Sequence, residues 1–152
     1  MDEILQTKQY IFGSIFLLSN KIQIFGDKIT DELTLKQWLL LNMLTHHIKI
    51  KPNFNDIAKA VGVTRQNVIK MIHILEKKEF VELHESHEDH RSIEVSLTPK
   101  TQKYFHKKQS IGNDFLNILF ENLSSDELII LKSSFSKIQH NILKLSKEEE
   151  HG

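Results

Sequence analysis

The sequence predicts a mainly helical fold that carries one small two-stranded β unit, and three observations lead to this fold class. Apolar residues recur at helical spacing towards both ends of the chain. Two short helical patterns meet at Gly62, near the middle. Between residues 93 and 97, apolar and polar side chains alternate as they do in a half-buried strand. The chain of 152 residues is long enough for one domain with helical extensions.

The two short helical patterns predict a helix-turn-helix unit over residues 54–78. Ile57 and Val61 share one face of the first helix. Gly62 suits the C-cap of that helix, because glycine tolerates a positive φ angle. Thr64 is placed to N-cap the second helix, whose buried side begins at Val68.

A hairpin is predicted directly after the second helix of this unit. Val81 and Leu83 suit its first strand, and Ile93, Val95 and Leu97 suit its second. The polar run HESHEDHRS lies between them and forms the tip. A hairpin in this position is a wing, so the sequence predicts a winged helix-turn-helix.

Short motifs in this region resemble the MarR family of bacterial transcriptional regulators. The stretch VTRQNVIKMIHILEKK is similar to the DNA-reading helix of that family, and Thr101 departs from it where the family often has glycine. The motifs that carry the resemblance are Leu75-Glu76-Lys77-Lys78, then Asp89-His90-Arg91, then Leu97-Thr98.

The resemblance implies a homodimeric regulator of transcription, a repressor, that binds double-stranded DNA. It implies that Arg91 enters the minor groove and that Asp89 steadies this arginine. It also implies a cleft between the winged core and the dimer helices for a small aromatic or amphipathic effector. Aromatic residues of the first helix and of the helix that holds Trp38 would line this cleft.

The start of the second helix of the unit carries residue types that read DNA. Arginine pairs with guanine, and glutamine or asparagine with adenine, in the major groove. Free N–H groups at a helix N-terminus favour phosphate, and nearby lysines suit phosphate contacts. An ordinary solvated surface is the alternative for each residue. The residues expected to contact DNA are Thr64, Arg65, Gln66, Asn67, Lys70, Lys77, Asp89 and Arg91, and Lys59 and Lys78 are further candidates for phosphate contacts.

Long helices are predicted on both sides of the winged core. An amphipathic pattern over residues 4–25 is expected to end at Gly26-Asp27. Thr34 and Gln37 form a capping box for the next helix. A third helix is expected to start at Thr98-Pro99 and to continue to Glu121.

The last helix has the most regular apolar spacing in the chain, and a capping box of Ser124 and Glu127 opens it. Its apolar residues follow a heptad seam, which suits packing against another helix and predicts dimerisation. The seam residues are Leu128, Leu131, Phe135, Ile138, Ile142 and Leu145. The expected organisation is an N-terminal dimerisation helix over 1–33, the winged helix-turn-helix over 34–98 and C-terminal dimerisation helices over 99–152.

Composition narrows the possible classes of protein. There is no cysteine, which excludes disulfides and thiol redox switches. No apolar run is long enough for a bilayer, and the acidic start does not resemble a signal peptide, so a cytoplasmic protein is expected. The formal net charge is zero, but residues 55–78 hold five basic and two acidic side chains. One positive face is sufficient for DNA binding.

The sequence is also compatible with other functions. No catalytic motif is present, so no enzyme and no cofactor are predicted. The wing holds many acids, so a winged-helix module for protein contact is one alternative. Its histidines and carboxylates give a second alternative, a metal-sensing regulator. The wing groups concerned are His84, Glu85, His87, Glu88, Asp89 and His90, and His46, His47, His106 and His140 lie elsewhere.

Overall fold

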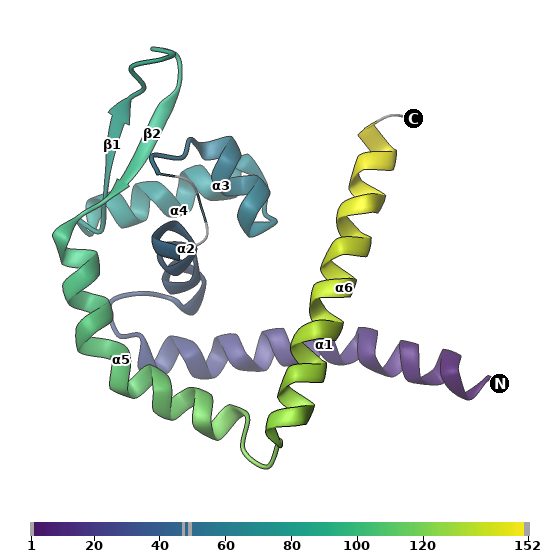
Figure 1. Cartoon of the computed structure of the whole chain (residues 1–152). Coiled ribbons are helices and arrows are strands. Elements are labelled where there is room, and N and C mark those ends of the chain that lie inside the picture. Colours follow the sequence, from purple (N-terminus) through teal and green to yellow (C-terminus); the bar gives the residue numbers. More distant parts are fainter. Residues whose placement is uncertain (1, 47, 49, 151–152) are drawn as a thin grey trace. The chain divides into compact units, whose positions relative to one another are not determined.

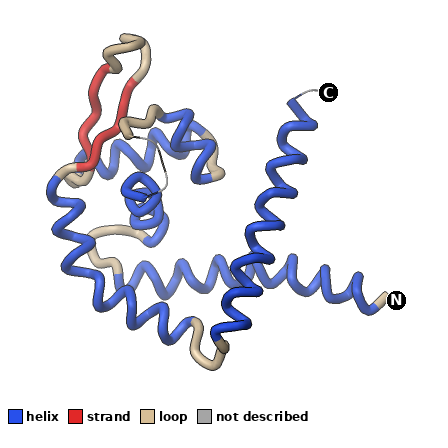
Figure 2. Tube along the Cα trace, in the orientation of Figure 1, coloured by secondary structure: helices blue, strands red, loops and turns tan. Residues whose placement is uncertain are grey.

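The computed structural model describes residues 2–46, 48 and 50–150, except for the side chains at 148 and 150. His47 lies outside the described residues. Helices dominate, and a single hairpin follows the fourth helix (Figures 1 and 2), which confirms the predicted fold class. The elements are α1 (Glu3–Ile29), α2 (Leu35–His46), α3 (Phe54–Val61), α4 (Arg65–Lys77), β1 (Val81–Glu85), β2 (Ile93–Leu97), α5 (Pro99–Leu119) and α6 (Ser125–Glu150).

The chain divides into two compact units, Met1–Gly112 and Asn113–Gly152. In the first unit, α2 lies between α1 and the pair α3–α4 (Figure 1). The hydrophobic core of this unit lies among α2, α3, α4, the wing and the start of α5. Its buried members are Leu33, Leu40, Leu41, Phe54, Ile57, Val68, Ile72, Leu75, Phe80, Val81, Val95 and Tyr104. Trp38 packs at the edge of this core, edge-to-face with Phe105.

Helix α1 continues past its predicted end at Gly26-Asp27 and stops at Ile29. The prediction was wrong because both residues serve the next helix from within α1. A Cβ at Gly26 would lie 2.5 Å from Leu35 Cδ2, so glycine allows α2 to pack closely. The carboxylate of Asp27 accepts a hydrogen bond from the N–H of Leu35 at 2.6 Å. Thr34 and Gln37 form the predicted capping box beside it.

The helix-turn-helix has the local signals that the sequence predicts. Gly62 adopts φ 74°, in the left-handed region, and its N–H donates to the carbonyl of Ala58. The Thr64 hydroxyl accepts from the N–H of Asn67 at 3.2 Å and caps α4. Asn53 and Asp56 form a capping box at the start of α3. Both helices of the unit are therefore fixed at their starts by side chains.

The wing is the antiparallel pair of β1 and β2, with Leu83 opposite Val95. The segment before α3 extends the pairing, because Asn53 forms a bridge with Glu94. The N–H of Val95 also donates to the carbonyl of Pro52 at 2.9 Å. The base of the wing is thus bonded to the entry of the helix-turn-helix.

Helix α5 begins at Pro99, as predicted, but Thr98 does not cap it through its side chain. The Thr98 hydroxyl donates instead to the carbonyl of Glu79 at 2.6 Å. The buried hydroxyl of Thr101 donates to the carbonyl of Phe80, also at 2.6 Å. The helix ends at Leu119, two residues before the predicted Glu121, and Asn122 in the following turn has φ 66°.

Helix α6 opens with the predicted capping box. The N–H of Glu127 donates to the Ser124 hydroxyl, and the Ser124 N–H donates to the Glu127 carboxylate at 2.8 Å. The Ser124 N–H and the Ser124 hydroxyl both donate to the Glu127 carboxylate, and these two bonds lower the pKa of Glu127 below its usual range. Over the described residues, no helix combines the length and the apolarity that crossing a bilayer requires.

Candidate nucleic-acid interface

The outer face of α4 presents a row of exposed polar side chains. Gln66, Lys70 and Lys77 are separated by four and seven residues, so they lie on one side of the helix. Val68 and Leu75 are fully buried on the opposite side and fix the helix on the core. His73 lies in the same row and is not among the predicted contacts, although its spacing from Gln66 could have identified it. We call Gln66, Lys70, His73 and Lys77 the outer row of α4.

Arg65 and Asn67 flank this row at the start of α4. The guanidinium of Arg65 lies over the ring of Phe54, the first residue of α3. Thr64 occupies only one N–H of the first turn, that of Asn67. No acid lies in this turn, so the helix N-terminus can receive an anion such as phosphate.

The wing tip is held by a short network of hydrogen bonds. The carboxylate of Asp89 accepts a hydrogen bond from the backbone N–H of Arg91 at 3.0 Å. The backbone carbonyl of Asp89 accepts one from the N–H of Ser92 at 2.8 Å. Asp89 therefore orders the backbone before Arg91. Among the described residues, no carboxylate lies within ion-pair distance of the Arg91 guanidinium, which leaves this exposed charge available to a ligand.

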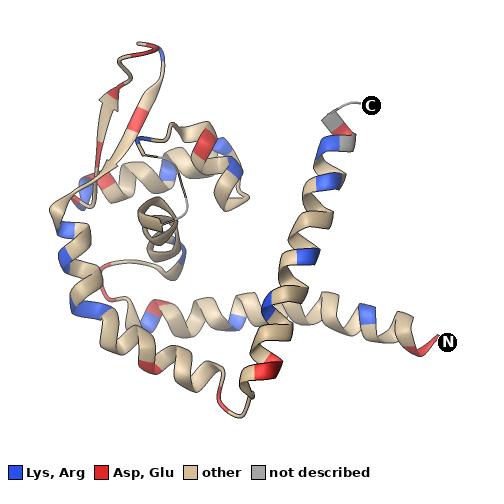
Figure 3. Cartoon of the chain, viewed as in Figure 1, with Lys and Arg blue, Asp and Glu red and all other residues tan. Residues whose placement is uncertain are grey.

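Charge follows the elements of the first unit unevenly. Figure 3 shows basic residues along α4 and the first half of α5, and acidic residues on the wing. One lysine next to α4 is not available for phosphate. The Lys78 ammonium is turned inward and donates to the carbonyl of Glu32. The predicted contacts on α4 therefore share an outer surface, and Lys78 does not belong to it.

The MarR family model matches residues 33–93, the stretch from the end of the α1–α2 turn to β2. This stretch is a MarR-family domain. The match covers α2, α3, α4, β1 and the tip of the wing, and it ends at the first residue of β2, before the Leu97-Thr98 motif.

Solved structures confirm the winged-helix fold of the MarR-family domain and its flanking helices. A MarR transcriptional regulator from Methanosarcina mazei Go1 has a TM-score of 0.80 at 21% identity, covering 90% of this chain and 99% of its own. A MarR/EmrR family regulator from Acinetobacter sp. ADP1 has a TM-score of 0.78 at 17% identity, covering 90% and 97%. The S. aureus MepR–DNA complex has a TM-score of 0.74 at 24% identity, covering 88% and 96%.

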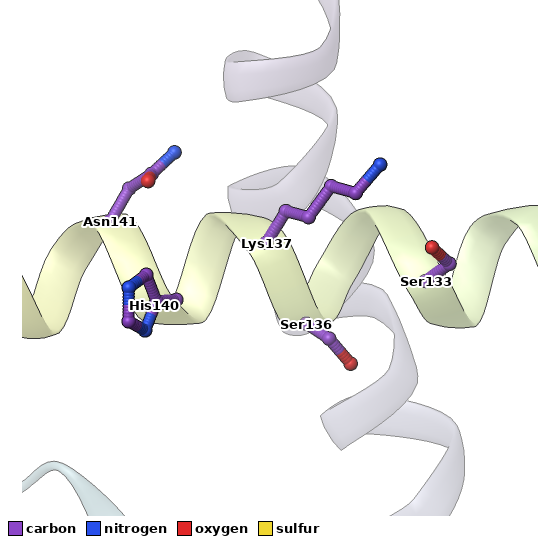
Figure 4. A pocket seen from close by; sticks show the side chains of 5 residues that line it. All are labelled: Ser133, Ser136, Lys137, His140 and Asn141. Carbon is purple, nitrogen blue, oxygen red and sulfur yellow. The ribbon is translucent and has the colours of Figure 1, made fainter.

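Beyond the MarR-family domain, α6 exposes the apolar seam that the sequence predicts. Leu128 and Ile138 are the least exposed members of the seam, at 36% each, and the other members are more exposed. A shallow pocket lies along the same helix and is lined by Ser133, Ser136, Lys137, His140 and Asn141 (Figure 4). At 100° per residue these polar residues lie opposite the seam. They do not form a catalytic or metal-binding set.

The histidines and acids of the wing form separate pairs. His84 Nε2 lies 3.6 Å from Glu82 Oε2, and His90 Nδ1 lies 3.9 Å from Glu85 Oε2. In the part of the chain that the structure describes, no three histidine or carboxylate groups gather in the way a metal ion needs. The wing surface therefore carries acids and histidines in pairs and not in a metal-binding cluster.

Proposed function

We propose that this chain is a transcriptional repressor that binds double-stranded DNA in a sequence-specific manner as a homodimer in the cytoplasm. The observation that carries this proposal is the outer row of α4, an exposed polar face on a helix that the domain core holds rigidly. Its place in a MarR-family domain supports the same function. The DNA-bound state of the similar MepR structure adds support by analogy.

In this proposal α4 lies in the major groove and the wing lies over the adjacent minor groove. Arg65, Gln66 and Asn67 reach base edges, because the N-terminal residues of such a helix meet the bases first. Thr64, Lys70 and Lys77 contact phosphates and fix the register. Arg91 enters the minor groove, where the negative potential attracts a guanidinium.

The dimer forms through the terminal helices. The seam of Leu128, Leu131, Phe135, Ile138 and Ile142 is exposed along α6, and Phe12, Phe16 and Phe25 are exposed on α1. Exposed apolar side chains along two long helices suit a protein–protein interface. A twofold dimer places two α4 helices on half-sites about one helical turn apart.

A small aromatic or amphipathic effector releases the DNA. Trp38, Phe105 and Tyr104 stack edge-to-face in the first unit, with ring centres 6.1 Å apart in each successive pair. Trp38 and Phe105 are half-buried, and an apolar aromatic lining with few polar groups suits such a ligand. A screen of phenolic and planar compounds should raise the melting temperature and weaken DNA binding. A screen in which no compound changes either quantity contradicts the effector.

The proposal is tested by selecting fragments from the source genome that the full chain retains, and by titrating salt on the selected fragments. Affinity should fall steeply with salt, since lysine and arginine displace counterions from phosphate. A selected fragment should bind much more tightly than a random duplex of equal length. Equal affinity for both duplexes contradicts sequence-specific binding.

A second candidate function is protein contact through the winged helix, and the acidic wing favours it. Glu82, Glu85 and Glu88 repel phosphate wherever the wing meets DNA. Absence of any salt-dependent DNA binding would support this candidate. Metal sensing, the other alternative, predicts that a divalent ion shifts DNA affinity, and no described cluster offers a site for one.

A further inference from the structure

Three segments of the first unit meet beside the C-terminal end of α4. They are the turn between α1 and α2, the turn between α4 and β1, and the first turns of α5. Two lysines and one glutamate join them, and we call Glu32, Lys78 and Lys100 the turn clamp. The clamp lies at the opposite end of α4 from Arg65, so its residues are distinct from the proposed base contacts.

The Lys100 side chain makes three contacts at the turn clamp. Its ammonium donates to the carbonyl of Lys78 at 2.9 Å and lies 3.2 Å from the Glu32 carboxylate. It also lies 4.6 Å from the centre of the buried Phe80 ring. Lys78 is the C-cap of α4, so Lys100 satisfies a carbonyl that the end of the helix leaves without an intrahelical partner.

Lys78 makes the reciprocal connection to α1. Its ammonium donates to the backbone carbonyl of Glu32, three residues after the last residue of α1. The end of α4 is therefore bonded to the α1–α2 turn directly through Lys78 and indirectly through Lys100. Both lysines lie close to the proposed DNA surface. The ammonium group of each one donates a hydrogen bond to a backbone carbonyl of the protein.

Further hydrogen bonds and an ion pair hold the α1–α2 turn and the α4–β1 turn. Asp31 and Glu79 have φ angles of 48° and 63°, a left-handed conformation that is costly for residues other than glycine. The Asp31 carboxylate pairs with Lys108, and the Glu79 carbonyl accepts from Thr98. The Tyr104 hydroxyl donates to the carbonyl of Thr30. Left-handed residues of this kind persist only where their surroundings hold them in place.

We infer that Lys78 and Lys100 are positioning residues that fix the angle between α4 and α1, and through it the half-site spacing that the dimer accepts. This inference rests on the proposed function, because α1 contributes to the proposed dimer interface and α4 to the DNA surface. Neither lysine contacts DNA. The turn clamp consists of two cations and a partly exposed carboxylate. Removing one of these charges therefore loosens the angle between α4 and α1 and leaves the hydrophobic core packed.

The test uses the full chain and a selected operator whose two half-sites are moved apart or together by one or two base pairs. Wild type should strongly prefer one spacing. Lys100→Met keeps an apolar stem over Phe80 and removes the charge, and it should reduce the preference for that spacing several-fold. Lys100→Arg should restore it, because arginine can donate and pair at the same place. Lys103→Met is the matched control, since Lys103 is exposed on the same helix and pairs with none of the described residues.

The salt dependence separates positioning from direct contact. Loss of a phosphate contact lowers the salt slope by about one, whereas a positioning residue leaves the slope unchanged on the best spacing. A Lys100→Met variant that melts as wild type does and keeps the wild-type spacing profile overturns the inference, as does a lowered slope. If Lys100→Met does not fold, Glu32→Gln tests the same pair. A wild-type chain with no sequence preference overturns the proposed function, and the inference falls with it.

Discussion

The guanidinium carbon of Arg65 lies 5.8 Å from the centre of the Phe54 ring, which joins the first residue of α4 to the first residue of α3. Phe54 is only 8% exposed, so its ring cannot move to follow the arginine. A cation over an aromatic face is stabilised by about 0.5–1 kcal/mol at exposed sites. The contact therefore favours conformations in which the Arg65 guanidinium lies over the ring.

Phe54→Leu should weaken specific DNA binding about two- to fivefold when Arg65 is present, which is the cation–π energy expressed as affinity. Arg65→Ala should cost on the order of 1–3 kcal/mol for the lost base contact and relax sequence preference. In the Arg65→Ala background, Phe54→Leu should cost little further affinity. Affinities of all four proteins, with melting curves as a check on folding, complete the double-mutant cycle. Equal costs of Phe54→Leu in both backgrounds would contradict the positioning of Arg65 by the ring.

Dimerisation through α6 is tested by two lysines placed in the seam. Leu131→Lys with Ile138→Lys should abolish the dimer, because each lysine would bury an unpaired charge between helices. Sedimentation at micromolar concentration measures the outcome. Ser133→Lys with Ser136→Lys is the matched control, since it adds the same charges to the opposite face of the same helix (Figure 4). A wild-type chain that sediments as a stable monomer would contradict the dimer.

The sequence alone predicts the local signals of this fold well. Gly62 and Thr64 fix the turn of the helix-turn-helix, and the capping boxes at Thr34 and Ser124 fix two helix starts. Each signal acts over three or four residues, so the helix end that it marks can be predicted without knowledge of the rest of the chain. The strict alternation from Ile93 to Leu97 has the same local character.

Contacts between distant segments could not be predicted in this way. Lys78 bonds to Glu32, 46 residues away, and a lysine next to a helix proposed to contact DNA gives no sequence signal for that partner. Gly26 serves the packing of Leu35, although in the sequence it resembles a helix end. Thr101 replaces a glycine that is frequent in the family, and its hydroxyl has a buried partner in the Phe80 carbonyl. Such roles depend on which segments the fold brings together.

The ion pair between Asp31 and Lys108 should make stability depend on pH in the acid range. The hydrogen bond and charge of Lys108 lower the pKa of Asp31 below the ordinary value of 3.8. The pair is therefore fully stabilising above that value, and the stabilisation is lost as pH falls through the lowered pKa. Asp31→Asn should melt below wild type at pH 7, and the two curves should converge in strong acid. Asp114→Asn, an exposed acid on α5, should match wild type throughout, and a constant gap for Asp31→Asn would contradict the pair.

Variants at the wing tip separate the effect of the Arg91 charge from the effect of the Asp89 hydrogen bond that orders the backbone there. Arg91→Ala should weaken binding to many sequences evenly and lower the salt slope by about one. Asp89→Ala should weaken binding more mildly, because it loses the hydrogen bond that orders the Arg91 backbone. Asp89→Asn keeps an acceptor and removes a negative charge, so it should bind as tightly as wild type or more tightly. Salt titrations on a selected and a random duplex measure all three. Tighter binding by Asp89→Ala would show that the carboxylate acts only by repulsion.

The histidines of the wing should make DNA binding tighter at pH 6 than at pH 8, at fixed salt. Imidazole gains a proton between these values, and each positive charge offsets an acid that repels phosphate. His84 faces Glu82 at 3.6 Å and Glu94 across the strands, and His90 faces Glu85 at 3.9 Å. The salt slope should be steeper at pH 6, because more cations would take part in binding.

The pH effect must come from the wing and not from α4, where His73 lies 3.4 Å from the carboxylate of Glu76. A variant with glutamine in place of His84, His87 and His90 should bind with nearly the same affinity at both pH values. His73→Gln is the control on α4 and should keep most of the difference. Equal wild-type affinity at pH 6 and pH 8, or tighter binding at pH 8, would contradict a titrating wing. A difference that disappears only in His73→Gln would assign the effect to α4, because that histidine belongs to the outer row beside Lys70 and Lys77.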